Sequence, residues 1–143
     1  MNYKLINDDA QKTYAIILES GEEAMEQLTI FTKKLNLSAS QFTAIGAFSD
    51  TTVGFFDFSI KDYKKNRFNQ QMEVVSLTGD ISMYKNEYKV HGHIVLANEN
   101  GVAFGGHLIK GIVHPTLEII LNESPLYLER QMDAESGLPL IKI

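Results

Sequence analysis

The spacing of apolar residues changes along the chain from a helical period to a period of two. In the segment 21–35 the apolar residues recur at helical spacing, at Ala24, Met25, Leu28, Phe31 and Leu35. This spacing predicts one amphipathic helix over 21–35. Ser20, followed three residues later by Glu23, has the capping-box pattern, so Ser20 is predicted to be the N-cap.

Runs rich in apolar and β-branched residues predict strands on both sides of this helix. The predicted strands cover 3–6, 13–18, 41–48, 53–58, 71–84 and 116–121. A break is expected at 49–52, and Gly46 and Gly54 inside their strands predict bulges or close backbone approach. The tail 125–143 is expected to be irregular, with one helical turn over 126–132.

Many strands and one helix predict an α+β fold, with a mainly antiparallel sheet covered by one principal helix. A single domain, 1–143, is expected because no internal repeat or boundary divides the chain. Some strand runs are apolar on both faces, as at Ile94-Val95-Leu96. One helix leaves part of such a sheet uncovered, so we expect oligomerisation to cover the remainder.

The segment 90–109 is predicted to form a β-hairpin. Its turn is Asn98-Glu99-Asn100-Gly101, where Gly101 suits the left-handed position at the end of the turn. In this turn Asn98 pairs with Val102 across a three-residue loop. Because the loop length fixes the pairing, the register of both strands can be counted outward from it.

That register gathers three of the four histidines of the chain. It places His93 directly opposite His107, and His91 shares the face of His93 because side chains alternate along a strand. Directly opposite Cβ atoms lie ~5 Å apart and diagonal ones ~7–8 Å apart. Three imidazoles in this triangle can close on one metal ion, although a slip of one residue would turn His107 to the other face.

Three histidines with an open position for water are a known catalytic zinc arrangement, so zinc is the expected ion. Imidazole also binds divalent iron, nickel, cobalt and copper. The alternative is three partly buried histidines satisfied by hydrogen bonds alone. His114, in a predicted turn, is a candidate fourth ligand or outer-shell base. Glu73 and Glu118 are candidates to orient a ligand histidine, and both also fit a solvent-facing position.

Composition narrows the class of protein further. There is no Cys, so a metal site must use His, carboxylate and water, and a cytoplasmic location is expected. No apolar run is long enough to span a membrane. The formal net charge of −5 disfavours nucleic-acid binding.

The basic cluster at Lys61, Lys64, Lys65 and Arg67 is interpreted as a solvated loop or strand edge. Phe55, Phe56 and Phe58 are expected in the core or a subunit interface.

Several motifs taken in order resemble one known family. They are Ile45-Gly46-Ala47, Gly54-Phe55-Phe56-Asp57, 72–79, His91-Gly92-His93, Gly105-Gly106-His107-Leu108 and 118–121. The order resembles the stand-alone prokaryotic form of the plants-and-prokaryotes conserved (PPC) domain, over nearly the whole chain. The resemblance implies an α+β homotrimer whose HGH and GGHL motifs hold a divalent metal, here through His91, His93 and His107. In plants the domain follows a DNA-binding AT-hook, and this chain has no such element.

Three hypotheses for function follow from these features. The first is a homotrimeric, metal-binding PPC-domain protein with an accessory role in DNA-associated or regulatory assemblies, either through protein partners or, as a minor alternative, by direct DNA binding. The second is a zinc-dependent, hydrolase-like enzyme that acts on a small molecule, with Glu73 or His114 moving the proton. The third is a purely structural metal that tightens the hairpin or the trimer. A closed pocket beside the metal position would separate the second hypothesis from the others.

Overall fold

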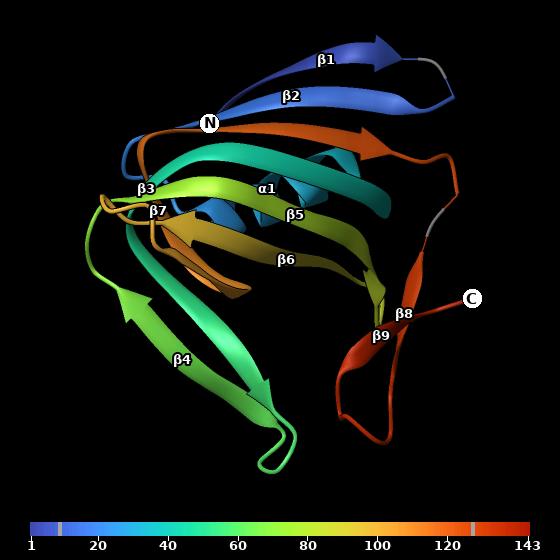
Figure 1. The fold of residues 1–143 in the computed structure, drawn as a ribbon. Coiled ribbons are helices and arrows are strands. Elements are labelled where there is room, and N and C mark those ends of the chain that lie inside the picture. Colours follow the sequence, from blue (N-terminus) through green and yellow to red (C-terminus); the bar gives the residue numbers. More distant parts are fainter. Residues whose placement is uncertain (9, 127) are drawn as a thin grey trace.

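The computed structural model describes residues 1–8, 10–126 and 128–143 (Figure 1). In these residues there are nine strands and one helix. The elements in chain order are β1 (Asn2–Asp8), β2 (Lys12–Glu19), α1 (Ala24–Leu35), β3 (Ala39–Asp57), β4 (Asp62–Phe68), β5 (Met72–Tyr84), β6 (Glu87–Ala97), β7 (Ala103–Glu123), β8 (Glu129–Met132) and β9 (Pro139–Lys142). None of the described residues belongs to a helix long and apolar enough to cross a membrane.

The strands form one sheet with the order β1-β2-β7-β3-β5-β8-β9. β4 extends it beside β3, and β6 pairs with both β5 and β7. Because β3 also pairs with β5 and β7, the four long strands β3, β5, β6 and β7 close a ring. Apart from the single parallel bridge between β5 and β8, the pairings are antiparallel. The predicted α+β fold with a mainly antiparallel sheet and one helix is confirmed.

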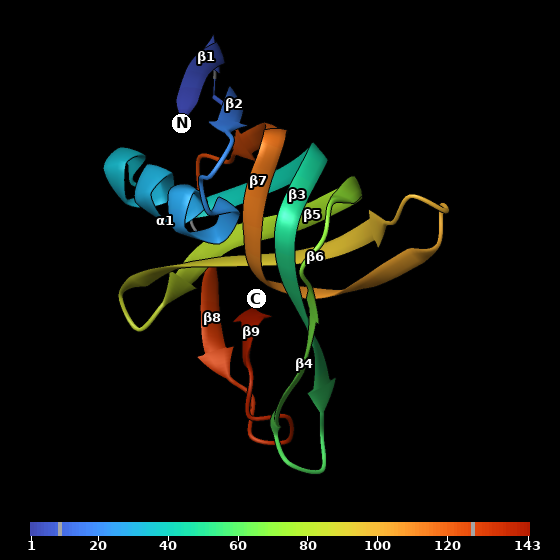
Figure 2. The same ribbon diagram turned by 90° about the vertical axis from the view of Figure 1, so that its left-hand side faces the viewer.

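Helix α1 covers one face of this sheet (Figure 2). Its buried residues are Ala24, Leu28, Phe31 and Thr32. They meet alternate side chains of the strands, among them the edge-to-face contact of Phe31 with Tyr14 of β2. Burial of such apolar side chains contributes about 1.5–3 kcal/mol each. The helix therefore holds the sheet from one side and leaves the other face open.

The helix begins three residues later than predicted, at Ala24. Its N-cap is Glu23, whose carboxylate accepts hydrogen bonds from the backbone N–H groups of Met25 and Glu26. The prediction of Ser20 as N-cap is therefore wrong. The Ser20 hydroxyl instead donates to the carbonyl of Pro115.

Strand β3 runs without interruption through the predicted break at 49–52. Thr51 in that segment is fully buried and pairs with residues on both β4 and β7. The predicted bulge at Gly46 is confirmed: the register shifts on both sides of it, and a Cβ there would lie 2.2 Å from the Thr116 carbonyl oxygen. At Gly54 a side chain, and not backbone as predicted, is the close neighbour, since a Cβ there would lie 2.6 Å from Cδ1 of Tyr63.

Of the basic cluster, Lys64, Lys65 and Arg67 lie on edge strand β4 and Lys61 lies in the turn before it, which agrees with the interpretation as a solvated loop or strand edge. Arg67 makes a two-point ion pair with Asp50, and Lys64 pairs with Asp57. Of the three neighbouring phenylalanines, Phe55 and Phe58 are more than two-thirds exposed and do not belong to the core.

The prediction of an irregular tail is wrong, because β8 and β9 form an antiparallel hairpin. Tyr127, inside the predicted helical turn, lies outside the described residues. Each of these strands has only four residues, which is too short for a clear strand pattern in the sequence. The side chain that fixes the hairpin is polar: Arg130 is 7% exposed and donates to groups on β5 and β9.

Candidate metal centre

The hairpin of β6 and β7 has the predicted turn. The N–H of Asn98 donates to the Val102 carbonyl at 3.1 Å, and the N–H of Gly101 donates to the Asn98 carbonyl at 2.9 Å. Gly101 has a φ of +73°, in the left-handed region. The pairing that follows places His93 opposite His107. The predicted register is therefore confirmed.

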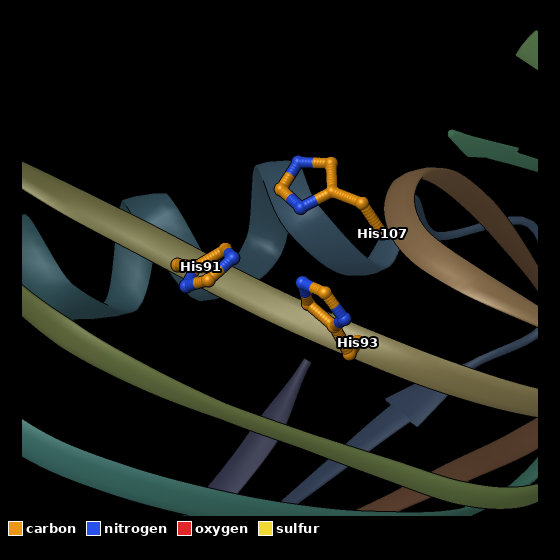
Figure 3. Close-up of side chains that lie close together, drawn as sticks. All are labelled: His91, His93 and His107. Carbon is orange, nitrogen blue, oxygen red and sulfur yellow. The ribbon is translucent and has the colours of Figure 1, made fainter. Parts of the chain in front are cut away.

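The three histidines on this hairpin converge on one point. One nitrogen from each imidazole can be chosen so that all lie within 4.8 Å of one another. The ring centroids are 5.0 Å apart for His91 and His93, 5.1 Å for His91 and His107, and 5.5 Å for His93 and His107. Figure 3 shows the His91 and His93 rings rising from β6 and the His107 ring reaching over them from β7.

The electrostatics favour the neutral form of two of these imidazoles, His93 and His107. Burial lowers the pKa of His107 to about 4, with further lowering from His91, His93 and Lys89. Burial and the neighbouring His91 likewise lower the pKa of His93. A metal ion binds the neutral ring through a nitrogen lone pair, so these shifts favour metal binding over protonation at neutral pH.

One atom in the cluster lacks a partner. The Nδ1 of His107 is buried and makes no hydrogen bond within the described residues. A buried polar atom without a partner costs about 1–3 kcal/mol. In Figure 3 the nitrogen next to the ring carbon that bears the side chain faces His93. A metal ion at the centre of the triangle would satisfy it, so the three residues fit such an ion.

The outer side of His107 is covered by an aromatic ring from β4. Tyr63 stacks on His107 with the ring centroids 4.7 Å apart. Gly54 on β3 makes room for this ring, since a Cβ at that position would lie 2.6 Å from Cδ1 of Tyr63. Burial raises the pKa of the Tyr63 phenol, so the group stays neutral. The stack fixes the plane of the His107 ring.

His91 is oriented by a carboxylate on β5. Asp80 Oδ2 lies 3.4 Å from His91 Nδ1, and Asp80 Oδ1 accepts a 2.6 Å hydrogen bond from the buried Arg130. Burial raises the pKa of Asp80, but hydrogen bonds from His91 and Arg130 outweigh it, so the pKa is lowered. Arg130 Nη2 also lies 3.3 Å from the same nitrogen. When Nδ1 carries the proton and donates to Asp80, Nε2 of His91 is free to bind a metal.

The residues predicted for this outer role lie elsewhere. Glu73 lines a polar groove beside the hairpin turn, and Glu118 lines an apolar groove between β2 and β3. His114 is within β7 rather than in a turn, with its Nδ1 3.2 Å from the Ser20 hydroxyl. In the described part of the chain no hydrogen bond joins any of them to the three histidines. The residues that contact the histidine cluster in this outer role are Asp80 and Arg130.

A signal for Asp80 was present in the sequence. Lys85 and Asn86 both have positive φ and form a two-residue turn between β5 and β6. Counting outward from a two-residue turn of that type places Asp80 opposite His91. Arg130 had no such local signal, because it reaches Asp80 from fifty residues away.

A small pocket of about 120 Å³ opens beside the three histidines. His91 and His107 form part of its wall, together with Lys89 and Arg130. A metal ion bound to His91 and His107 would adjoin this pocket, whereas the third ligand, His93, is exposed and lies outside its lining.

Comparison with known proteins gives the family. The Plants and Prokaryotes Conserved (PCC) domain matches residues 6–125, and the chain belongs to this family. This confirms the resemblance drawn from the HGH and GGHL motifs. Two bifunctional GlmU proteins from Synechococcus strains also match, the first at 28% identity over 129 residues and 88% of this chain. The chain spans about a fifth of the length of these curated relatives.

Solved structures of similar proteins share the whole fold. A plant- and prokaryote-conserved (PPC) protein of Pyrococcus horikoshii is 31% identical, with a TM-score of 0.86 over 99% of this chain and 95% of that one. A metal-containing protein of Archaeoglobus fulgidus is 26% identical, with a TM-score of 0.84 over 99% and 97%. A proposed DNA-binding protein of Bacteroides thetaiotaomicron is 25% identical, with a TM-score of 0.88 over 98% and 96%.

The pKa of His107 predicts how the metal-free protein responds to pH. Its folded value of about 4 lies below the ordinary 6.5, so between these values the unfolded chain binds more protons. This contribution to stability is complete above pH 6.5 and is lost as the pH falls toward 4.

We therefore expect the free energy of unfolding of His107→Gln to decrease less than that of wild type between pH 7 and 4.5. The measurement is a urea titration in the presence of chelator. His114→Gln is the control and should retain the wild-type slope. A His107→Gln slope equal to wild type would contradict this assignment.

Proposed function

We propose that this PCC-domain protein binds one divalent metal ion, zinc, through His91, His93 and His107. The observation that carries the proposal is the convergence of three imidazole nitrogens within 4.8 Å, one ring having a buried Nδ1 without a partner. The similar protein of Archaeoglobus fulgidus is described as metal-containing, which agrees with it. Three imidazoles leave a coordination position open for water or another ligand.

The chain's own residues prepare this position. When Nδ1 of His91 donates to Asp80, its Nε2 is free for the metal, and the Tyr63 ring holds the plane of His107. A zinc ion held by three histidines supplies a Lewis acid and lowers the pKa of bound water to about 7. The pocket beside the site favours a role in binding or converting a small molecule over a purely structural metal. A zinc-dependent, hydrolase-like enzyme is therefore the second candidate function.

A role in DNA-associated or regulatory assemblies would use protein partners and not direct contact with DNA. The chain carries a formal net charge of −5. On the most basic strand, β4, Arg67 and Lys64 are paired with aspartates of β3. Since cationic side chains that neutralise phosphates supply most of the affinity for DNA, such pairing weakens it.

We also propose that the protein assembles as a homotrimer. The sheet face opposite α1 has exposed apolar side chains on adjacent strands: Ile17 is 38% exposed, Ile45 60%, Val75 55% and Ile120 45%. They line a groove of about 520 Å³. A contiguous apolar face of this kind is typical of a protein–protein interface, and further copies of the same chain would bury it.

The metal site predicts the metal content of the purified protein. Protein prepared without an affinity tag or chelator should contain close to one zinc per chain by elemental analysis. His93→Ala should lose that metal because two imidazoles remain, whereas His114→Ala, which removes the one histidine outside the cluster, should keep it. Equal metal contents in the two variants, or no metal in wild type after incubation with zinc, would refute the site.

The contact of Asp80 with His91 predicts a graded effect on affinity. Asp80→Asn should weaken zinc binding ~10- to 100-fold, the usual effect of losing the group that orients a ligand histidine. Asp50→Asn, which breaks the surface pair with Arg67, is the matched control. Competition with a chromophoric chelator measures both affinities. An Asp80→Asn affinity within twofold of the control would remove Asp80 from the site.

The apolar face predicts the oligomeric state. Light scattering after size exclusion should give three times the 16.1 kDa mass of the chain. Ile45→Glu should dissociate the trimer because it places a charge in the interface. Ile30→Glu, on a side chain of α1 that is 47% exposed, should leave the mass unchanged. A monomeric wild type would contradict the trimer, and an Ile45→Glu variant that stays trimeric would move the interface to another face.

A further inference from the structure

The pocket at the metal centre has an unbalanced charge. Lys89 precedes His91 by two residues on β6, so its side chain lies on the same face as the histidines and lines the pocket. No carboxylate of the described residues forms an ion pair with it. Arg130, the other cation in the wall, is already paired with Asp80. Lys89 is therefore the uncompensated cation of the pocket, and it favours an anionic ligand.

The lining of the pocket contains no Asp or Glu among the described residues. A divalent metal between the histidines would add further positive charge on the same side. An anion that enters would be attracted to the metal and to the Lys89 ammonium together. Lys89 lines the pocket together with His91 and His107, and its charge acts on His107, so the charged group of the ligand is expected on the histidine side of the pocket.

Another part of the wall is apolar. The C-terminal hairpin contributes Leu138, Pro139 and Leu140, and the Tyr63 ring, which is stacked on His107, also lines the pocket. The buried Arg130 holds the hairpin in place by donating to Ser82 of β5 and to the carbonyl of Pro139. These hairpin residues lie beyond 6–125, the part of the chain that matches the family.

The size of the pocket limits the ligand. Its volume is about 120 Å³, so it holds a few small groups and not a large ligand. A ligand with one charged group and a short hydrocarbon part fits this space. Inorganic phosphate has the charge but no hydrocarbon part to contact Leu138 and Leu140.

We propose that this pocket binds a small carboxylate, with the carboxylate group between the metal and Lys89 and the short hydrocarbon part against Leu138 and Leu140. The proposal rests on the proposed metal site. It narrows the ligand class of that site to short-chain organic acids.

The test uses the full-length protein loaded with cobalt, an ion that imidazole also accepts and that absorbs visible light. Propionate is titrated into the protein, and the cobalt spectrum reports a ligand that enters the coordination position. Propionamide, a neutral molecule of nearly the same shape, and inorganic phosphate are titrated in parallel. We expect saturable spectral change with propionate, weaker change with phosphate and none with propionamide.

The variant Lys89→Met removes the charge and keeps much of the side-chain length. It should weaken propionate binding about tenfold, a difference of ~1.4 kcal/mol, while cobalt still binds. Lys89→Arg should restore binding, and Lys33→Met, which removes an exposed charge on α1, should bind like wild type.

The outcomes separate the two proposals. If cobalt does not bind, the metal site itself is wrong. If cobalt binds but propionate and propionamide act alike, phosphate binds more tightly than propionate, or Lys89→Met binds like wild type, the carboxylate proposal alone is overturned.

Discussion

The candidate site depends on the register between β6 and β7. A turn of three residues after Asn98 sets that register, and the register places His93 opposite His107. A shift by one residue would turn His107 to the far face of the sheet and would leave two histidines without the third. Backbone pairing over a few residues therefore positions all three imidazoles, and no long loop is needed to bring them together.

Burial and a second layer of contacts prepare the three imidazoles to bind a metal ion. Burial keeps His107 neutral, and the stacked Tyr63 fixes its plane. Asp80 orients His91 and is itself held by Arg130 from the C-terminal hairpin. The hairpin thus serves two purposes, because it supports the outer contacts of the histidines and also forms the apolar wall of the adjacent pocket.

Features that depend on local interactions could be predicted from the sequence, and features that depend on contacts between distant residues could not. The histidine triangle was predictable because the Asn98–Gly101 turn is local and strongly specific. The C-terminal hairpin and Arg130 were not, because their partners on β5 are some fifty residues away and each strand has only four residues. Strand β4 was obscured by its lysines, which an edge strand tolerates. Glu73 and Glu118 are carboxylates within apolar runs. That pattern does not indicate whether the side chain points toward the histidines or toward solvent.

The central claim is that the three imidazoles share one metal ion. A crystal of the zinc-loaded protein, measured on both sides of the zinc absorption edge, tests it most directly. The account predicts one anomalous peak per chain between His91, His93 and His107, with zinc–nitrogen distances of ~2.0–2.1 Å. An anomalous peak only at surface carboxylates or at His114, with none between the three imidazoles, would contradict it.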